Sequence, residues 1–275
     1  MTKNSKLSFQ NTTHQRGSKK MRKIYDLSLK LQEGATEPNP PKIVRSLHEA
    51  GIYRLGKIAG VEPEAFPNGQ ALAADVVTAG EHNGTHVDAP FHYGPMSEGK
   101  TAMTIDEVPL EWCIGDGVIL DMVHKKPGEE ITVEDMKAEL ERIGYTLKEN
   151  DIVIIKTGCD KYWGTDTETY MKMQSGLGLA GLKWLLDQGI NSIGIDAWTL
   201  DRPVYAMVAD YRASGDKNDL WPVHFYGRQH SYLQIEKLAG LDQLPTPFGF
   251  TISALPIKID GGTAGWCRAV AIYNN

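Results

Sequence analysis

The 275-residue chain is poor in cysteine and has no long apolar run. Its three cysteines, Cys113, Cys159 and Cys267, are spread widely along the sequence. They are too few and too scattered for a disulfide scaffold or a cysteine-based zinc site. No uninterrupted apolar stretch approaches the ~18 residues that a membrane span needs, so we expect no membrane-spanning helix.

The composition also lacks any strong bias. Hydrophobic residues make up 41% and charged residues 23% of the chain, with 28 glycines and 14 prolines. These proportions are ordinary for a globular protein and exclude collagen-like, low-complexity and wholly disordered chains. A chain of this length buries a full core without disulfides, and we expect one domain over residues 24–275.

Basic residues are scarce beyond the N-terminus. Of 29 lysines and arginines, seven lie in the first 23 residues, where there is no acid; the remainder has 22 bases against 35 acids. An acidic body argues against nucleic acid as a partner. We expect residues 1–23 to be a disordered basic leader; a targeting peptide, a nucleic-acid arm and a downstream start at Met21 are the alternatives. The leader lacks the apolar region of a secretory signal, and we expect a cytoplasmic protein.

Helical and strand patterns alternate along the middle of the chain. Thr132 and Asp135 resemble a capping box, apolar residues recur at spacings of three and four up to Ile143, and Gly144 is suited to end that helix. A second helix over 179–188 lies between β-branched runs, and such alternation is typical of an α/β unit. We expect strands at 24–29, 71–79, 117–123, 151–156, 190–196, 248–259 and 267–273, and a loop over 33–44. The fold class is therefore α/β, with a mixed, barrel-like sheet.

Three of the eight histidines fall in one eleven-residue segment, HNGTHVDAPFH, which runs from His82 to His92. Imidazole and carboxylate groups are ligands of divalent ions such as Zn²⁺ and Mn²⁺. His86 and Asp88 are two residues apart, so an extended segment places them on one face, and Gly84 lets the backbone fold closely around an ion. We expect His82, His86 and Asp88 to converge on one ion, with His92 outside the ligand set. Structural hydrogen bonding, the usual role of a single histidine, does not easily explain this cluster.

The segment resembles the H-x-G-T-H-x-D-x-P-x-H signature of the cyclase family, which contains bacterial kynurenine formamidases and isatin hydrolases. It matches at every fixed position. Farther along, His224 is followed twelve residues later by Glu236 before a short apolar run, which is similar to the same family. The resemblance covers about residues 24–275. It implies a single-domain swivelling β/β/α fold and a homodimer or higher homo-oligomer.

The resemblance also implies one or two divalent ions, Zn²⁺ or Mn²⁺. His82, His86 and Asp88 resemble the ligands of the first ion. Asp88 would bridge to a second ion held by His224 and Glu236. His230 competes with His224 as a ligand, although its offset from Glu236 is six residues.

The activity that the resemblance implies is hydrolysis of an amide-type C–N bond in a small molecule. The family includes arylformamidases of tryptophan catabolism, which convert N-formyl-kynurenine to kynurenine and formate, and isatin hydrolases. His92 resembles the acid/base histidine beside the metal-bound water. Ring closure or lactone hydrolysis at the same site, and a non-catalytic metal-bound interaction protein, are the alternatives.

Several further side chains are candidates for the site or its support. Trp198, Trp221 and Tyr226 are candidate substrate-binding residues, with core packing as the alternative. They lie in or beside an insertion-like stretch, 202–223, that compact formamidases lack, so the sequence leaves the substrate open. We expect Thr85 to brace the metal loop by hydrogen bonding. Three other residues are expected to be structural, as a buried inert thiol and two loop caps: Cys159, Asp196 and Asp201.

Overall fold

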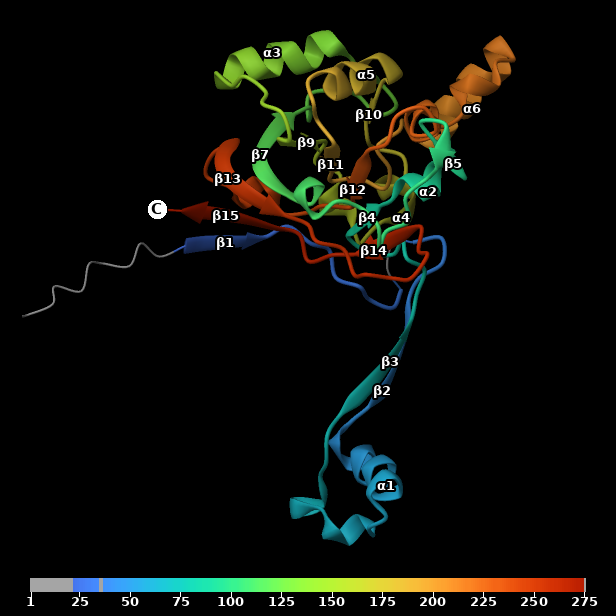
Figure 1. Ribbon diagram of the computed structural model, residues 1–275, viewed down its shortest axis with the longest axis vertical. Coiled ribbons are helices and arrows are strands. Elements are labelled where there is room, and N and C mark those ends of the chain that lie inside the picture. Colours follow the sequence, from blue (N-terminus) through green and yellow to red (C-terminus); the bar gives the residue numbers. More distant parts are fainter. Residues whose placement is uncertain (1–21, 35–36, 275) are drawn as a thin grey trace, which may run out of the picture.

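The centre of the fold is a nine-stranded mixed sheet that curls into a barrel-like shape (Figure 1). The structure is a computed structural model and describes residues 22–34 and 37–274. In spatial order the strands are β1 (Arg22–Asp26), β15 (Val270–Asn274), β13 (Phe248–Ser253), β7 (Ile114–Asp121), β9 (Ile152–Lys156), β11 (Ser192–Ile195), β12 (Leu233–Glu236), β4 (His86–Asp88) and β14 (Ala264–Trp266). The α/β class and the mixed, barrel-like sheet are thereby confirmed.

The four middle strands, β7, β9, β11 and β12, run parallel to one another, and every other pairing in the sheet is antiparallel. Parallel neighbours need a crossover, and each of the three crossovers contains helices. Helix α3 (Val133–Ile143) joins β7 to β9, and α5 (Leu179–Asp187) joins β9 to β11; both lie over the same face (Figure 1). Four other helices are α2 (Pro90–Tyr93), α4 (Thr167–Tyr170), α6 (Val204–Ser214) and α7 (Pro222–Tyr226).

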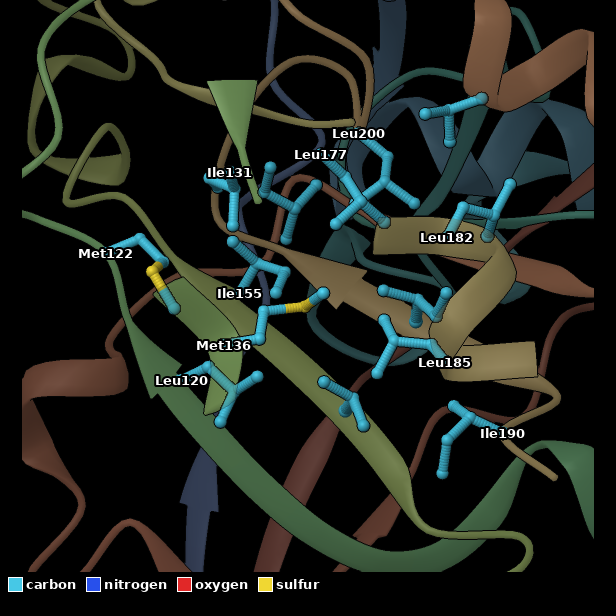
Figure 2. Close-up of a cluster of buried hydrophobic side chains, with 14 of the residues drawn as sticks. Leu120, Met122, Ile131, Met136, Ile155, Leu177, Leu182, Leu185, Ile190 and Leu200 are labelled. Carbon is cyan, nitrogen blue, oxygen red and sulfur yellow. The ribbon is translucent and has the colours of Figure 1, made fainter. Parts of the chain in front are cut away.

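Hydrophobic side chains are buried on both faces of these middle strands. Along β7, Val118 and Leu120 join a core beneath α3 and α5, whereas Ile119 joins a second core on the opposite face. Figure 2 shows the first core, where Met136 of α3 and Leu182 of α5 meet the strands. Because the strands are buried on both faces, their sequences are continuous runs of apolar residues.

The predicted start and end of α3 are confirmed. The Thr132 hydroxyl accepts a hydrogen bond from the backbone N–H of Asp135, and the Asp135 carboxylate accepts one from the N–H of Thr132. Gly144 ends the helix in the left-handed conformation, at φ 69°. These contacts lie within a few residues of each other, which is why the sequence predicts the helix bounds well.

A long arm leaves the body and was only partly predicted. Strands β2 (Lys42–Ser46) and β3 (Ala74–Thr78) form an antiparallel ribbon that carries α1 (His48–Ala59) at its tip, away from the sheet (Figure 1). The strand expected at 71–79 is confirmed as β3. The loop expected over 33–44 is wrong at residues 42–44, because pairing with β3 makes them a strand, and α1 was missed.

Three other features differ from the predictions or add to them. Strand β1 begins at Arg22, so the last two residues of the expected leader belong to the sheet; residues 1–21 lie outside the described residues. Strand β14 was not predicted. The stretch 202–223 contains α6 and the start of α7. Within the described ranges, no helix is long and apolar enough to span a membrane.

Candidate metal centre

The candidate site is built on β4, a short buried strand between β12 and β14. His86 and Asp88 lie two residues apart on this strand and so share a face, as the sequence predicts. Glu236 of β12 is the register partner of His86, which puts its carboxylate on that same face. His86 and Asp88 are fully buried, and Glu236 is 5% exposed.

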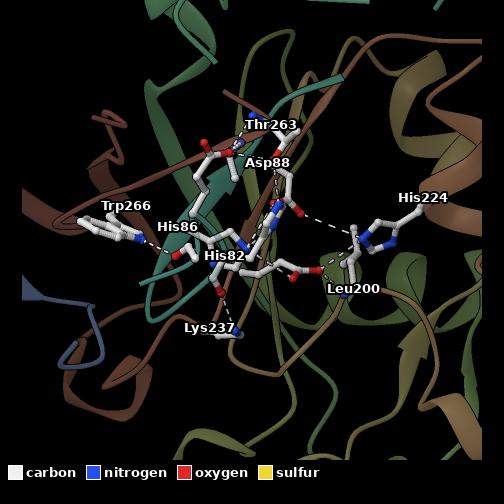
Figure 3. A network of polar contacts seen from close by, with 12 residues as sticks. His82, His86, Asp88, Leu200, His224, Lys237, Thr263 and Trp266 are labelled. Atoms are coloured by element: carbon white, nitrogen blue, oxygen red, sulfur yellow. Dashed lines mark hydrogen bonds and ion pairs between the residues drawn. The ribbon is translucent and has the colours of Figure 1, made fainter. Parts of the chain in front are cut away.

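Side chains from three separate segments converge on Asp88 (Figure 3). His82 Nδ1 lies 2.8 Å and His86 Nε2 lies 3.2 Å from Asp88 Oδ1. His86 Nε2 also lies 3.7 Å from Glu236 Oε2. From α7, His224 Nε2 lies 4.0 Å from Asp88 Oδ2 and 3.9 Å from Glu236 Oε1. The structure therefore brings together all five residues that the sequence singles out as metal ligands.

The chemistry of this cluster fits a divalent cation. Apart from the 2.8 Å contact of Oδ1 with His82 Nδ1, neither carboxylate oxygen of Asp88 accepts a hydrogen bond from any residue that the structure describes, although both are buried. Burial works to raise the pKa of Asp88, but His82 and the neighbouring histidines outweigh it and hold the pKa well below its ordinary value. His86 Nδ1 lies 2.9 Å from the carbonyl of Gly84, so its Nε2 is the atom turned toward Asp88. A buried carboxylate ringed by imidazole nitrogens is suited to bind a metal.

Asp201 positions His224. Its Oδ2 lies 2.6 Å from His224 Nδ1, and the same carboxylate accepts the backbone N–H groups of Val223 and His224. Burial lowers the pKa of His224, but the hydrogen bond to Asp201 outweighs it and raises the pKa to about 9. Asp201 is therefore a cap, as expected, and it also orients a candidate ligand. The sequence could not show this, because 22 residues separate Asp201 from Val223.

A buried ion pair supports the His82 side of the site. Lys237 Nζ lies 2.7 Å from Glu37 Oε2 and donates to the His82 carbonyl at 2.6 Å. Glu37 in turn accepts the N–H of Gly84 at 2.7 Å. Thr85 braces the same loop, as predicted, by donating to the Lys237 carbonyl. Glu37 and Lys237 were not predicted from the sequence, where the only signal is the position of Lys237 directly after Glu236.

His92, on α2, lies at the edge of the cluster and faces the adjoining cavity. Its ring centroid is 4.1 Å from that of His82. Desolvation lowers the pKa of His92 to about 4, against the opposing effect of Asp88, so the ring is neutral near pH 7. Ligand atoms of His82, Asp88 and His92 all lie within 4.8 Å of one another. This geometry suits an acid/base group and is also compatible with a metal ligand.

A cavity of about 380 Å³ opens beside these residues. Trp198 and Trp221 line it, as expected, together with Thr199 and Phe225. Tyr226 is not among the residues that line it, and its role in substrate binding stays a prediction. It packs against the core beneath α3 and α5, the alternative given for it above, and lines a second cavity between α5 and the other side of α7.

The remaining candidates lie outside the cluster. His230 has its Nδ1 3.2 Å from the carbonyl of Ser231 and joins no ligand group among the described residues. Cys159 is buried, which raises its pKa to about 11, and both features fit the inert thiol expected from the sequence. Asp196 accepts hydrogen bonds from Thr157 and Gly158, which confirms it as a loop cap.

The chain is similar in sequence and in fold to several known proteins. The chain is 23% identical over 241 residues to isatin hydrolase from Roseibium aggregatum, covering 85% of this chain and 84% of that protein. It is 25% identical over 255 residues to kynurenine formamidase from Erythrobacter litoralis, covering 92% and 94%. The crystal structure of an isatin hydrolase bound to the product analogue thioisatinate has a TM-score of 0.71 at 20% identity, covering 92% and 93%.

The family model Cyclase matches residues 25–202, which is more than half of the chain and includes the whole segment from His82 to His92. The resemblance read from that segment is thereby confirmed. The chain belongs to the Cyclase family.

Proposed function

We propose that this protein is a metal-dependent hydrolase of an amide-type C–N bond in a small aromatic substrate, such as an aryl formamide or an isatin-like ring. One observation carries the proposal: Asp88, a buried carboxylate that accepts no hydrogen bond from the described residues beyond its contact with His82, is ringed by histidines at the wall of a tryptophan-lined cavity. Relatives named isatin hydrolase and kynurenine formamidase support the same reaction class. The unpaired cysteines support a reducing, cytoplasmic location.

In this proposal five side chains hold one or two ions, Zn²⁺ or Mn²⁺: His82, His86, Asp88, His224 and Glu236. When bound, such an ion supplies Lewis-acid polarisation of the scissile carbonyl and a more acidic water. The carboxylates supply negative charge, and the fixed ring orientations of His86 and His224 supply the geometry.

The protein's own residues perform the proton transfers. Neutral His92 accepts a proton from the water as the new C–O bond forms at the carbonyl carbon. It then returns this proton to the nitrogen, so that the C–N bond breaks and the amine leaves. Trp198 and Trp221 offer apolar faces on which an aromatic ring can pack. The cavity volume is at the lower end of the ~300–1,000 Å³ range of small-molecule sites, which favours a substrate of one or two rings.

Product analysis with a chelator tests the proposal. The purified protein, with Zn²⁺ or Mn²⁺ added, is assayed on N-formyl-kynurenine, isatin and simple lactones. We expect C–N hydrolysis that the chelator removes and the metal restores, and that Asp88→Asn lacks. Turnover of lactones alone, ring closure, or full activity in metal-free protein would contradict it.

A further inference from the structure

The second cavity, between α5 and the outer side of α7, gathers bases on an otherwise acidic protein. Its volume is about 590 Å³, and three bases line it: Lys183 of α5, Lys217, and Arg228, which follows α7. Beyond residue 23 the chain has 22 bases against 35 acids. None of the described residues that line this cavity is nevertheless an acid. We call it the basic cavity.

The positive charges of the basic cavity have no counter-charge in the described part of the chain. None of its three bases forms an ion pair with any residue that the structure describes. Asp216 and Asp219, the acids nearest to Lys217 in the sequence, accept hydrogen bonds within their own segment instead. Like charges gathered at one cavity repel each other, so an anion bound there would be favoured.

Aromatic rings hold two of the bases at the cavity. Lys183 Nζ lies 4.9 Å from the centroid of the Tyr226 ring, and Arg228 Cζ lies 4.0 Å from that of Phe225. Arg228 Nε also donates to the carbonyl of Tyr93 at 2.7 Å. Its two terminal nitrogens have no hydrogen-bond partner among the described residues. A guanidinium held in this way is suited to bind a carboxylate through both terminal nitrogens or through one of them.

The remaining walls of the basic cavity favour a ligand that has a ring as well as a charge. Tyr226 and Phe225 offer aromatic faces, and Leu179 and Pro222 add aliphatic surface. The volume lies within the ~300–1,000 Å³ range of small-molecule sites. All three bases are exposed, so a ligand reaches them from solvent.

We propose that the basic cavity binds a small aromatic carboxylate. Its carboxylate contacts the three bases, and its ring packs on the aromatic and aliphatic walls. Phe225 lines both this cavity and the one beside the candidate metal centre, so the ligand lies behind the helix that carries His224. The proposal does not depend on the proposed hydrolysis, because none of the three bases lines the cavity beside the metal centre.

Isothermal titration calorimetry of the full, metal-loaded chain with benzoate tests this proposal. Benzamide has the same ring without the charge, and inorganic phosphate has the charge without a ring. The variant Lys183→Gln/Lys217→Gln removes two of the three bases. The matched control Lys126→Gln/Lys137→Gln removes the same charge from exposed lysines elsewhere, and Lys137 likewise lies over a ring, 5.7 Å from that of Trp184. Circular dichroism establishes that each variant is folded.

We expect the wild type and the control to bind benzoate with a millimolar or lower dissociation constant, and to bind benzamide and phosphate more weakly. The variant that lacks two bases should bind benzoate about 5–30-fold more weakly. The proposal is overturned if the wild type shows no saturable binding, or if benzamide or phosphate binds as tightly as benzoate. Benzoate affinity that is unchanged in this variant would overturn it as well, because the carboxylate would then lie elsewhere, as at the candidate metal centre.

Discussion

At the residue scale, the candidate site is a set of side chains that would repel or lie unpaired without a cation. Asp88 and Glu236 are two buried carboxylates on neighbouring strands, and burial together with Asp88 raises the pKa of Glu236. Burying two such acids is costly unless positive charge compensates them. The histidines around them supply part of that compensation, and a bound ion would supply the rest.

His92→Ala separates acid/base chemistry from metal binding. We expect this variant to keep its metal and its melting temperature but to lose turnover by ~10²–10⁴-fold, the usual value of a general acid/base group. Kinetics, metal content and thermal melting are measured together. His230→Ala, outside the cluster, is the matched control. Lost metal would show that His92 is a ligand, and unchanged turnover would show that it takes no part in the chemistry.

Asp201→Asn tests whether Asp201 positions His224. The amide cannot hold the imidazole as the carboxylate does, and we expect metal affinity to fall by ~10–100-fold. Competition with a chromophoric chelator measures this affinity without reference to activity. Asp210→Asn, which removes a partly exposed partner of Arg202, is the control. Equal affinities in wild type and Asp201→Asn would mean that Asp201 only caps α7.

Asp196 makes stability depend on pH away from the metal site. Burial raises its pKa from 3.8 to about 6. The folded protein therefore binds this proton more tightly than the unfolded chain, and the contribution of Asp196 to the unfolding free energy falls as pH rises from about 4 to about 6. Asp196→Asn cannot ionise, so its unfolding free energy relative to wild type should rise by about 3 kcal/mol across that window. Denaturant titrations of both proteins at about pH 4 and about pH 6 measure this difference in unfolding free energy. A difference that does not change with pH would refute a contribution from Asp196 ionisation.

At the element scale, α7 carries His224 to the cavity, and Trp221, which directly precedes this helix, lines the same cavity. The position of α7 depends on Tyr93 of α2. The Tyr93 ring stacks on Tyr232 with a centroid distance of 5.1 Å and contacts His224 edge-on at a centroid distance of 5.5 Å. Gly227, at the end of α7, lies directly against this ring. The position of a candidate ligand thus depends on aromatic packing between two short helices.

Gly227→Ala should disturb that packing. A Cβ at this position would lie 2.1 Å from Cδ2 of Tyr93, so the ring or the helix must move. We expect the unfolding free energy to fall by ~1–3 kcal/mol, the usual cost of overpacking a core. The double variant Gly227→Ala/Tyr93→Leu should recover part of this loss, measured as a double-mutant cycle. Additive losses would place the cause elsewhere.

At the scale of the whole molecule, a metal ion would tie together segments that lie far apart in the sequence. The candidate ligands come from 82–88, 224 and 236 and meet only in the folded state. We expect chelation to lower the melting temperature by roughly 10 °C. This follows from ~4 kcal/mol of binding at 1,000 times the dissociation constant and ~2–4 °C per kcal/mol. Differential scanning calorimetry with and without Zn²⁺ or Mn²⁺ measures it, and identical melting curves would contradict metal binding at this site.

Residues close together in the chain allowed the most secure predictions. The capping box of α3, the buried strands β9 and β11, and the placement of His86 and Asp88 on one face all follow from backbone geometry over a few residues. The segment from His82 to His92 also carried the family resemblance. Each of these features depends on local spacing, so neighbouring residues alone specify it.

Tertiary structure decided the rest, because the remaining features depend on pairings across long stretches of chain. The meeting of Glu236 with His86 follows from the register of β12 on β4, and the Glu37–Lys237 pair joins residues 200 positions apart. Of the arm, β3 was predicted, whereas β2 and α1 were not. Strand β2 forms only by pairing with β3, which follows it after α1 in the chain. Register and packing arise from contacts between distant segments, which no local pattern encodes.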